Sequence, residues 1–337
     1  MGIFRKAYQI TSSDGIDALS LAELEVPQPG PREVLVRVRA SSLNYRDLIT
    51  VENPESRGFA YPRIPNSDGA GEIVEIGRDV SRFKVGDRVC GIFFQSWIGG
   101  KINADDMNTA LGGSAEGMLA EYRVLSENGL VMTPPHMSDQ EAATLPCAAV
   151  TAWNSLMAGE VGAGDTVLLL GTGGVSIVAL QLCTMLGARA VITSSSDEKL
   201  ERAKKLGAWR TINYGSNPEW EKEVLSETNG QGVDHVVEVG GPGTLQKSID
   251  ATRLGGSIGL IGVLAMGNID PLPILMKSLR VQGIYVGSRQ MFEAMNRALS
   301  MHEVKPVVDK VYPMANAKEA YHDMRKAGHF GKLVIEL

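Results

Sequence analysis

The chain has 337 residues, 44% of them hydrophobic and 21% charged, and a formal net charge of −6. This length exceeds what a single hydrophobic core usually serves, so we expect two domains. The acidic balance argues against binding to a nucleic-acid backbone, which favours a basic protein surface. The composition therefore indicates a globular protein that does not bind nucleic acid.

The N-terminal sequence and the cysteines indicate in which cellular compartment the protein is expected. The first residues, MGIFRKAYQI, lack the apolar stretch of a signal peptide, and no apolar run in the chain approaches the ~20 residues that span a bilayer. Cys90, Cys147 and Cys183 are odd in number and widely spaced. They exclude a four-thiolate structural zinc and favour a reducing compartment. We expect a cytoplasmic protein without a membrane partner.

Residues 1–125 show the pattern of a β-rich region with many turns. Apolar and polar side chains alternate in EVLVRVRASSL (33–43), GAGEIVEIG (69–77) and KVGDRVCGIFF (84–94), and glycine and proline separate these runs. Short strands at this spacing predict a small, barrel-like β domain.

The pattern changes near Pro146, where apolar strand-like runs begin to alternate with helical ones. The runs are TVLLLG (166–171), ARAVITS (188–194), TINY (211–214), DHVVEVG (234–240) and GSIGLIGV (256–263), with helical segments at 174–187 and 197–207. Strands that are apolar on both faces, in a βαβ rhythm, predict a doubly wound parallel sheet of the Rossmann type. The last ~50 residues predict helix, strand, helix and a closing strand. We assign 1–148 and 287–337 to the first domain and 149–286 to the second.

A glycine cluster follows the first strand of the second domain. It comprises Gly171, Thr172, Gly173, Gly174 and Val175. In a dinucleotide-binding turn the first glycine permits the tight bend, and the next two let backbone N–H groups approach a pyrophosphate at the helix N-terminus. Ser176 stands where a third small residue packs helix against strand. A tight turn without a ligand is the alternative, but the repeated βα units favour a nucleotide.

The end of the next strand bears on which nicotinamide cofactor is used. In NAD sites an acidic residue about 20 positions past the glycines binds the ribose 2′-OH, but this chain has Ser194 there. Hydroxyls of Ser194 and Ser195 can donate to a 2′-phosphate, Lys199 can supply charge, and Tyr214 can close over the phosphate. We therefore expect NADP(H). The same segment would also serve as a capped helix start, with Ser196 or Asp197 as the cap, and both interpretations can hold together.

Six segments carry a resemblance to a known family. They are SSLNYRDL (41–48), PNSDGAGEIVEIGRDVSRFKVGDRV (65–89), LPCAAVTAWNSL (145–156), GTGGVS (171–176), KLERAKKLGA (199–208) and HFGKLVIEL (329–337). In this order they resemble the medium-chain dehydrogenase/reductase superfamily, and within it the zinc-independent quinone oxidoreductase and enoyl reductase branches. The resemblance implies a GroES-like β-rich domain formed by the two ends of the chain, a Rossmann domain, and a homodimer.

The resemblance also bears on metal binding. Zinc alcohol dehydrogenases of this superfamily bind catalytic zinc through Cys, His and Cys with a nearby Glu; by motif, these positions fall on Asn44, Ser67-Asp68 and Cys147. A thiolate with an amide, a hydroxyl and a carboxylate is a poor zinc site, because zinc prefers thiolate and imidazole donors. Residues 95–117 contain no cysteine, so the structural zinc lobe is missing too. We expect no metal.

Without a Lewis acid, the acceptor must spread the incoming charge itself. A quinone or an α,β-unsaturated carbonyl does so, and a few hydrogen-bond donors can then suffice. Similar motifs in this branch place an Asn and a Tyr beside the nicotinamide, so the candidate catalytic residues are Asn44, Tyr45 and Asp47. Tyr45 would donate to the substrate oxygen or guide the proton, Asn44 would position the carbonyl or the nicotinamide, and Asp47 would form a supporting ion pair with Arg46. In the alternative, this segment only turns the chain and Tyr45 packs half-buried.

The resemblance implies further contacts to the cofactor. Thr151 matches a threonine that contacts the nicotinamide, Val263 follows a strand whose backbone binds the carboxamide, and Lys332 matches a basic position near the pyrophosphate. Each of these could instead be an ordinary packing or surface residue. The five histidines do not cluster and read as structural or solvated.

We expect an NADPH-dependent reductase of a small apolar carbonyl or quinone substrate. The apolar preference rests on Phe59, Phe94, Trp97 and Met107, in segments expected to surround the substrate. The alternatives are an NAD(P)-dependent alcohol dehydrogenase of the same superfamily and a cofactor-binding structural or sensor protein without turnover.

Overall fold

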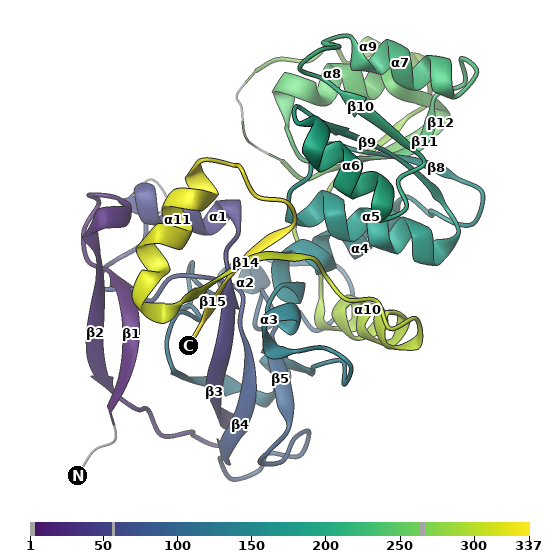
Figure 1. Cartoon of the computed structure of the whole chain (residues 1–337). Helices are drawn as coiled ribbons and strands as arrows, with labels where there is room; N and C mark the ends of the chain where they lie inside the picture. The colour runs from purple at the N-terminus through teal and green to yellow at the C-terminus, as the bar shows by residue number, and fades with distance from the viewer. Residues whose placement is uncertain (1–3, 56–57, 263, 265–266) are drawn as a thin grey trace. The chain divides into compact units, whose positions relative to one another are not determined.

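The computed structural model describes residues 4–55, 58–262, 264 and 267–337. The chain forms two compact units, Met1–Val150 with Gly287–Leu337, and Thr151–Val286 (Figure 1). The division expected from the sequence ends the first segment at 148 and resumes it at 287. The α/β fold class, with a GroES-like and a Rossmann-like domain, is confirmed.

The first unit is built on a seven-stranded sheet and a separate two-stranded one. The large sheet has the order β14-β15-β3-β4-β5-β7, and β6 pairs with β3. Its strands are β3 (Glu33–Ser42), β4 (Ala70–Ile76), β5 (Arg88–Gly91), β6 (Tyr122–Ser126), β7 (Leu130–Met132), β14 (Val308–Pro313) and β15 (Lys332–Glu336), and β1 (Phe4–Ile10) pairs with β2 (Leu19–Glu25). The helices are α1 (Tyr45–Glu52), α2 (Ala104–Met107), α3 (Asp139–Ala142), α10 (Arg289–Met301) and α11 (Ala317–Arg325).

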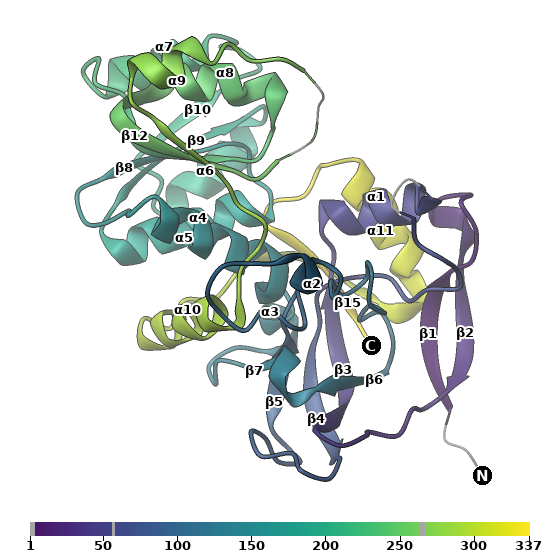
Figure 2. The ribbon, with the colours of Figure 1, turned by 180° about the vertical axis from the view of Figure 1, so that it is seen from behind.

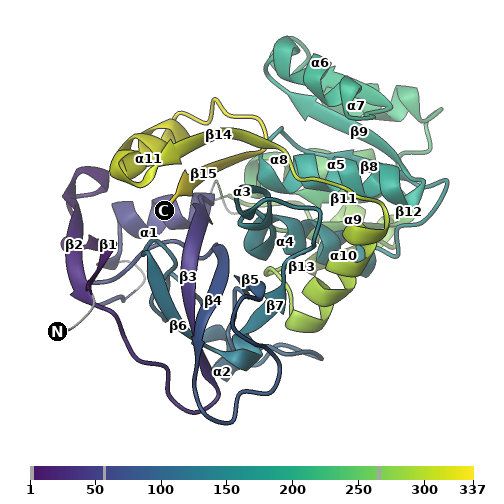
Figure 3. The same ribbon diagram turned by 60° about the horizontal axis from the view of Figure 1, so that its bottom comes forward.

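The two ends of the chain meet in this sheet. The last strand, β15, pairs antiparallel with β3, with Val334 opposite Ser42 and Ile335 opposite Ser41 (Figure 3). The predicted helix, strand, helix and closing strand of the C-terminus are present as α10, β14, α11 and β15. This pairing brings Lys332, the first residue of β15, to the end of β3.

The second unit is a six-stranded, wholly parallel sheet in the order β10-β9-β8-β11-β12-β13. This is the doubly wound order of dinucleotide-binding domains. The strands are β8 (Thr166–Leu169), β9 (Arg189–Ser194), β10 (Arg210–Asn213), β11 (Val233–Glu238), β12 (Thr252–Leu260) and β13 (Arg280–Gly283). Of the helices, α4 (Val150–Ala158) and α5 (Gly174–Leu186) lie on one side of the sheet, and α7 (Trp220–Glu227), α8 (Pro242–Ala251) and α9 (Leu272–Met276) on the other (Figure 2).

The helix α6 (Asp197–Lys205) shows how local sequence sets these elements. Its N-cap is Ser196, whose hydroxyl accepts a hydrogen bond from the Lys199 N–H. Acidic residues occupy its first turn and basic residues its last, which complements the helix dipole. The helix-capping interpretation of this segment is therefore confirmed.

One expectation about the first unit is wrong. Phe94 and Trp97, which we expected to border the substrate, are only 1% and 6% exposed. Their rings pack edge to face with centroids 6.2 Å apart. They belong to the core of the unit, because burying large aromatic rings stabilises it more than a surface position would.

No helix in the described part of the chain combines the length and hydropathy that crossing a bilayer requires.

Candidate functional site

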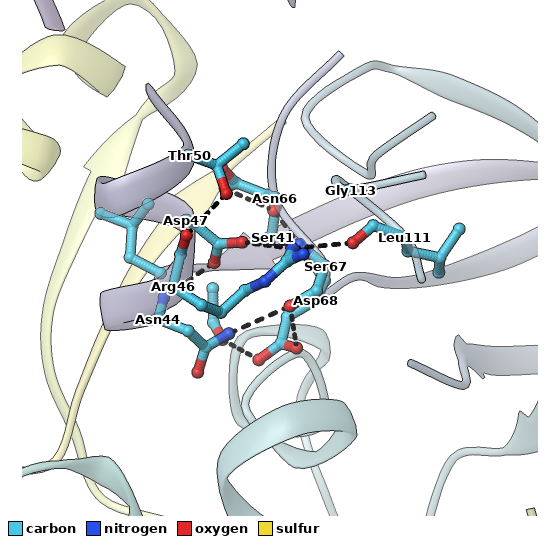
Figure 4. A network of polar contacts seen from close by, with 12 residues as sticks. Ser41, Asn44, Arg46, Asp47, Thr50, Asn66, Ser67, Asp68, Leu111 and Gly113 are labelled. Carbon is cyan, nitrogen blue, oxygen red and sulfur yellow. Dashed lines mark hydrogen bonds and ion pairs between the residues drawn. The ribbon is translucent and has the colours of Figure 1, made fainter. Parts of the chain in front are cut away.

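A buried polar cluster begins at the N-terminus of α1. Asn44 caps this helix, and the Asp47 carboxylate accepts hydrogen bonds from the backbone N–H groups of Asn44 (2.9 Å) and Ser67 (3.1 Å). Arg46 pairs with Asp47 at 3.1 Å and donates to the Leu111 carbonyl at 2.8 Å (Figure 4). Asp47 thus ties α1 to the loop that carries Ser67.

Asp47 is buried, with 1% of its surface exposed. Burial raises the pKa of its carboxyl group, and the neighbouring Arg46 opposes that rise. The carboxylate is enclosed by groups of its own unit, so it positions the cluster rather than meeting a substrate. The ion pair with Arg46 is the supporting role that the sequence predicted for Asp47, and its burial disfavours a direct catalytic one.

The loop after Asn66 supplies the second part of the cluster. Ser42 Oγ donates to one Asp68 carboxylate oxygen at 2.7 Å, and Ser67 Oγ donates to the other at 3.1 Å. Asn44 Nδ2 in turn donates to Ser67 Oγ at 3.3 Å. These bonds bring together Asn44, Ser67 and Asp68, the positions that the sequence comparison aligned with metal ligands (Figure 4).

A further layer of hydrogen bonds holds this loop in place. Asn66, which has a positive φ of 69°, donates from Nδ2 to Ser41 Oγ at 3.0 Å, and Ser41 Oγ donates to the Asp68 carbonyl at 2.7 Å. The buried Tyr321 hydroxyl of α11 donates to Asn66 Oδ1. Burial raises the pKa of Tyr321 well above its ordinary value. Tyr321 therefore acts as a neutral support for the loop.

Lys332 completes the cluster from the C-terminal strand. Its ammonium donates to the Leu43 carbonyl at 2.6 Å and to Asn44 Oδ1 at 2.5 Å, and it lies 3.5 Å from Asp68 Oδ2. Only 2% of the residue is exposed. The resemblance implied a pyrophosphate contact for Lys332, whereas the structure directs the ammonium into this cluster.

Cys147 lies in a π-helical turn, Leu145–Ala149, near the same charges. Burial raises the pKa of its thiol far above the ordinary range; the negative charge of Asp68 adds to the rise, and the positive charge of Lys332 opposes it. A thiol in this setting is protonated at neutral pH. Among the described residues, no three His, Cys, Asp or Glu side chains are grouped so that they could hold a metal ion.

Tyr45, the first residue of α1, differs from the rest because its side chain is 47% exposed. At this exposure Tyr45 is half-buried, which fits both the catalytic role and the alternative of a packing residue. Tyr45 is held in position because Asn44 and Asp47 fix the start of its helix. Of the three candidate catalytic residues, Tyr45 is the one most open to a substrate.

In the second unit, the glycine turn is shaped to receive a ligand. Gly171 has a φ of 71°, which favours glycine, and its N–H donates to Thr193 Oγ1 at 3.2 Å. Gly173 is the N-cap of α5, and no side chain caps that helix there. A Cβ added at Gly171 or Gly173 would meet no atom within 4 Å. At Gly173 the backbone is extended, so neither packing nor conformation requires glycine there. An open approach to uncapped N–H groups is what a pyrophosphate needs.

The remaining residues of the turn differ in exposure. Thr172 is buried, whereas Gly174 and Val175 are partly exposed at the first turn of α5. Ser176 is 1% exposed, and its hydroxyl donates to the Leu170 carbonyl at 2.6 Å. The serine therefore joins helix to strand where a glycine would merely allow close packing.

The residues expected around a 2′-phosphate cluster at the end of β9. Ser194 is buried, with 4% of its surface exposed, and its Oγ accepts a hydrogen bond from the Ser196 N–H at 3.2 Å. Ser195 is exposed, Lys199 is partly exposed in the first turn of α6, and the side chain of Tyr214 is 43% exposed. The Tyr214 N–H donates to the Ser194 carbonyl at 3.0 Å, so these residues share one edge of the sheet.

Thr151 and Val263 are the two remaining residues expected to contact the cofactor. Thr151 is buried in α4, with 3% of its surface exposed. Val263 lies outside the described residues.

The described geometry also includes a buried carboxylate that the sequence analysis missed. Glu238, at the end of β11, accepts hydrogen bonds from the N–H groups of Gly240 (2.8 Å) and Gly241 (3.0 Å) and from the hydroxyls of Thr244 and Ser248. The sequence alone could have pointed to it, because Glu238 is a charged residue that interrupts the apolar residues of the strand just before Gly240-Gly241. It fixes the loop at the carboxyl end of β11.

Comparisons with known proteins agree with this architecture. The family model of the alcohol dehydrogenase GroES-like domain matches residues 30–135, and that of the zinc-binding dehydrogenases matches residues 174–301. A zinc-type alcohol dehydrogenase-like protein of Schizosaccharomyces pombe is 45% identical over 333 residues, covering 96% of each chain.

Solved structures give the same result. A putative alcohol dehydrogenase from Sinorhizobium meliloti superposes with a TM-score of 0.94 at 37% identity, covering 100% of this chain and 99% of the other. An NAD-dependent alcohol dehydrogenase gives a TM-score of 0.89 at 32% identity, covering 98% and 99%. The chain therefore belongs to the medium-chain dehydrogenase/reductase superfamily, whose fold implies a nicotinamide cofactor, and is an oxidoreductase.

Proposed function

We propose that this protein is a cytoplasmic, NADPH-dependent reductase of quinones or α,β-unsaturated carbonyls that works without catalytic zinc. The observation that carries the proposal is the composition of the cluster around Asn44, Ser67, Asp68 and Cys147, which already contains the ammonium of Lys332. Reduction of a plain ketone relies on a strong stabiliser for the alkoxide, usually a metal. A conjugated acceptor needs less, because it delocalises the incoming charge.

The residues do not fit zinc. Zinc prefers thiolate and imidazole donors, but only Cys147 among the aligned positions offers a thiol, and no histidine occupies the others. Asn44 Oδ1 and Asp68 Oδ2 already face the Lys332 ammonium. We therefore assign no step of the reaction to a metal, although the family model and the Schizosaccharomyces pombe relative carry zinc in their names.

The second unit has residues that fit a nicotinamide cofactor, which supplies the hydride when bound. Gly171, Gly173 and the N-terminus of α5 would hold its pyrophosphate, since a Cβ at either glycine meets only open space. Ser194 and Lys199 would hold a 2′-phosphate, and the absence of a carboxylate at position 194 supports NADPH over NADH.

Tyr45 and Asn44 would act on the substrate oxygen. Tyr45, the first residue of α1, is 47% exposed, and Asn44, the residue before it, is 8% exposed, with its Nδ2 donating to Ser67 Oγ. Each can donate a hydrogen bond to an oxygen that gains charge as the hydride arrives. Asp47 holds both residues in place through the backbone of Asn44.

NADPH oxidation tests the proposal when followed spectrophotometrically with quinones and enones beside simple aldehydes, with alcohol oxidation measured in parallel and zinc determined by elemental analysis. We expect turnover of quinones or enones by protein that contains no stoichiometric zinc. Exclusive turnover of alcohols, or one bound zinc per chain, would refute it.

Two alternatives make different predictions in the same assay. An NAD(P)-dependent alcohol dehydrogenase is favoured by the names of the relatives and predicts turnover of alcohols and aldehydes. A cofactor-binding structural or sensor protein predicts NADPH binding without oxidation of any compound in the panel.

We also propose that the protein is a homodimer through the outer edge of the second unit. β13 ends the order of its sheet, so one edge of this strand has no neighbouring strand in that sheet. Leu275 and Met276 of α9, just before it in the chain, are 73% and 70% exposed. Light scattering after size exclusion should give twice the chain mass, and Leu275→Glu should shift it toward the monomer. A monomeric wild-type protein would overturn this assignment.

A further inference from the structure

We propose that the Lys332 ammonium is the resident cation of the cluster around Asn44 and that it fixes which way the Asn44 side-chain amide faces. Lys332 is then a positioning residue that acts through Asn44. The assignment rests on the contacts of β15 with the end of β3 and with the start of α1.

The burial of Lys332 is the first argument. An ammonium with 2% exposure is stable only when paired and hydrogen-bonded. Here two neutral oxygens accept hydrogen bonds from it, the Leu43 carbonyl and Asn44 Oδ1, and the Asp68 carboxylate lies 3.5 Å away. Removal of Lys332 would leave Asp68 with only the hydroxyls of Ser42 and Ser67 as donors among its described contacts.

The charge balance of the cluster is the second argument. Its two carboxylates, Asp47 and Asp68, are matched by two cations, Arg46 and Lys332. A divalent ion added beside Lys332 would bring two uncompensated positive charges into a buried site, where such charges are strongly unfavourable. The lysine therefore supplies the positive charge that a metal would otherwise bring.

The direction of the Asn44 amide is the third argument. An ammonium group carries donors only, so it donates to the amide oxygen and repels the amide NH₂. With Oδ1 held by Lys332 at 2.5 Å, Nδ2 must face the other way, toward Ser67 Oγ at 3.3 Å. Asn44 consequently presents a donor on that side. A carbonyl or quinone oxygen is the type of substrate atom that this donor suits, and this last step rests on the proposed function.

A double-mutant cycle on the whole chain tests the position of the cation. The variants are Lys332→Met, Asn44→Asp and their combination, with Lys84→Met, an exposed lysine of the same unit, as the matched control. Asp at 44 keeps an oxygen for Lys332 but loses the Nδ2 donor. We expect Asn44→Asp to lower the melting temperature by at least roughly 5 °C more in the Lys332→Met background than in the wild type. In the Lys84→Met background its effect should equal that in the wild type.

The result of the double-mutant cycle does not depend on whether the protein turns over a substrate. Equal effects of Asn44→Asp with and without Lys332 would overturn the proposal, because the charge would then not be coupled to position 44. If Lys332→Met does not fold, Lys332→Gln replaces it, since glutamine is uncharged and can still donate hydrogen bonds. The comparison is made by circular dichroism melting and needs no substrate.

Steady-state kinetics test whether Asn44 Nδ2 donates a hydrogen bond to the substrate oxygen. We expect Asn44→Asp to fold and to lose at least roughly tenfold in kcat/KM for the quinone or enone that the wild type reduces, because an oxyanion then meets an acceptor instead of a donor. Unchanged kcat/KM would overturn the role of Nδ2. If the wild type reduces nothing in the panel, the proposed function fails while the melting cycle still decides the assignment of Lys332.

Discussion

Acidification should destabilise the second unit through His235. This residue of β11 is 1% exposed, and its two ring nitrogens lie 2.9 Å from Ser155 Oγ and 2.8 Å from Ser257 Oγ. Burial, assisted by the positive charge of Arg280, lowers its pKa from 6.5 to about 4. In the folded chain the ring is therefore neutral at pH values where it is already protonated in the unfolded chain.

The sign and size follow from proton linkage. Between pH 6.5 and about 4 the unfolded chain binds a proton at His235 that the folded chain does not. The free energy of unfolding is therefore unaffected by His235 above pH 6.5 and decreases as the pH falls through this range. Over the two pH units from 6.5 to 4.5, this difference in proton binding lowers the free energy of unfolding by about 2.5 kcal/mol.

The assay is urea unfolding at pH 7.5 and pH 4.5, followed by tryptophan fluorescence, since Trp153, Trp209 and Trp220 lie in this unit. In His235→Gln the loss of stability between the two pH values should be smaller by about 2.5 kcal/mol than in the wild type. The control His302→Gln should lose as much as the wild type, because His302 is already exposed when folded. An equal loss in His235→Gln and the wild type would refute the reasoning.

Three further predictions concern the sites themselves. Gly173→Ala should leave the melting temperature within about 1 °C, because its Cβ meets only open space, yet weaken NADPH binding at least roughly tenfold in fluorescence titrations; Gly162→Ala, also open, should change neither. Ser194→Asp should lower the affinity for NADPH relative to NADH, and an unchanged ratio would contradict the assigned 2′-phosphate contact. Asp47→Ala should lower the free energy of unfolding in urea by about 3–5 kcal/mol, because it strands a partly buried Arg46. Glu72→Gln, in the half-exposed pair with Arg39, should change it by no more than about 1 kcal/mol, and equal losses would contradict this account.

Several features were readable from the sequence because they depend on neighbours in the chain. The βα rhythm predicted the parallel sheet, since strands buried on both faces must be apolar throughout. The glycine turn and the Ser196 cap follow from backbone conformation and local hydrogen bonds, which act over a few residues. The residue types at Asn44 and Ser67 argue against zinc through side-chain identity alone, and the absence of zinc stays a prediction.

Other features were decided only by tertiary structure. Phe94 and Trp97 are core residues rather than substrate contacts, and nothing in their local pattern distinguishes a buried ring from one at a binding surface. Asp47 is enclosed because a loop some 20 residues further along folds back over it, as its bond to Ser67 shows. Lys332 reaches Asn44, which lies 288 residues earlier in the chain, because β15 pairs with β3. Such long-range pairing leaves no periodicity in the chain, so the cation at the centre of the cluster is fixed by the sheet that joins the two ends of the protein.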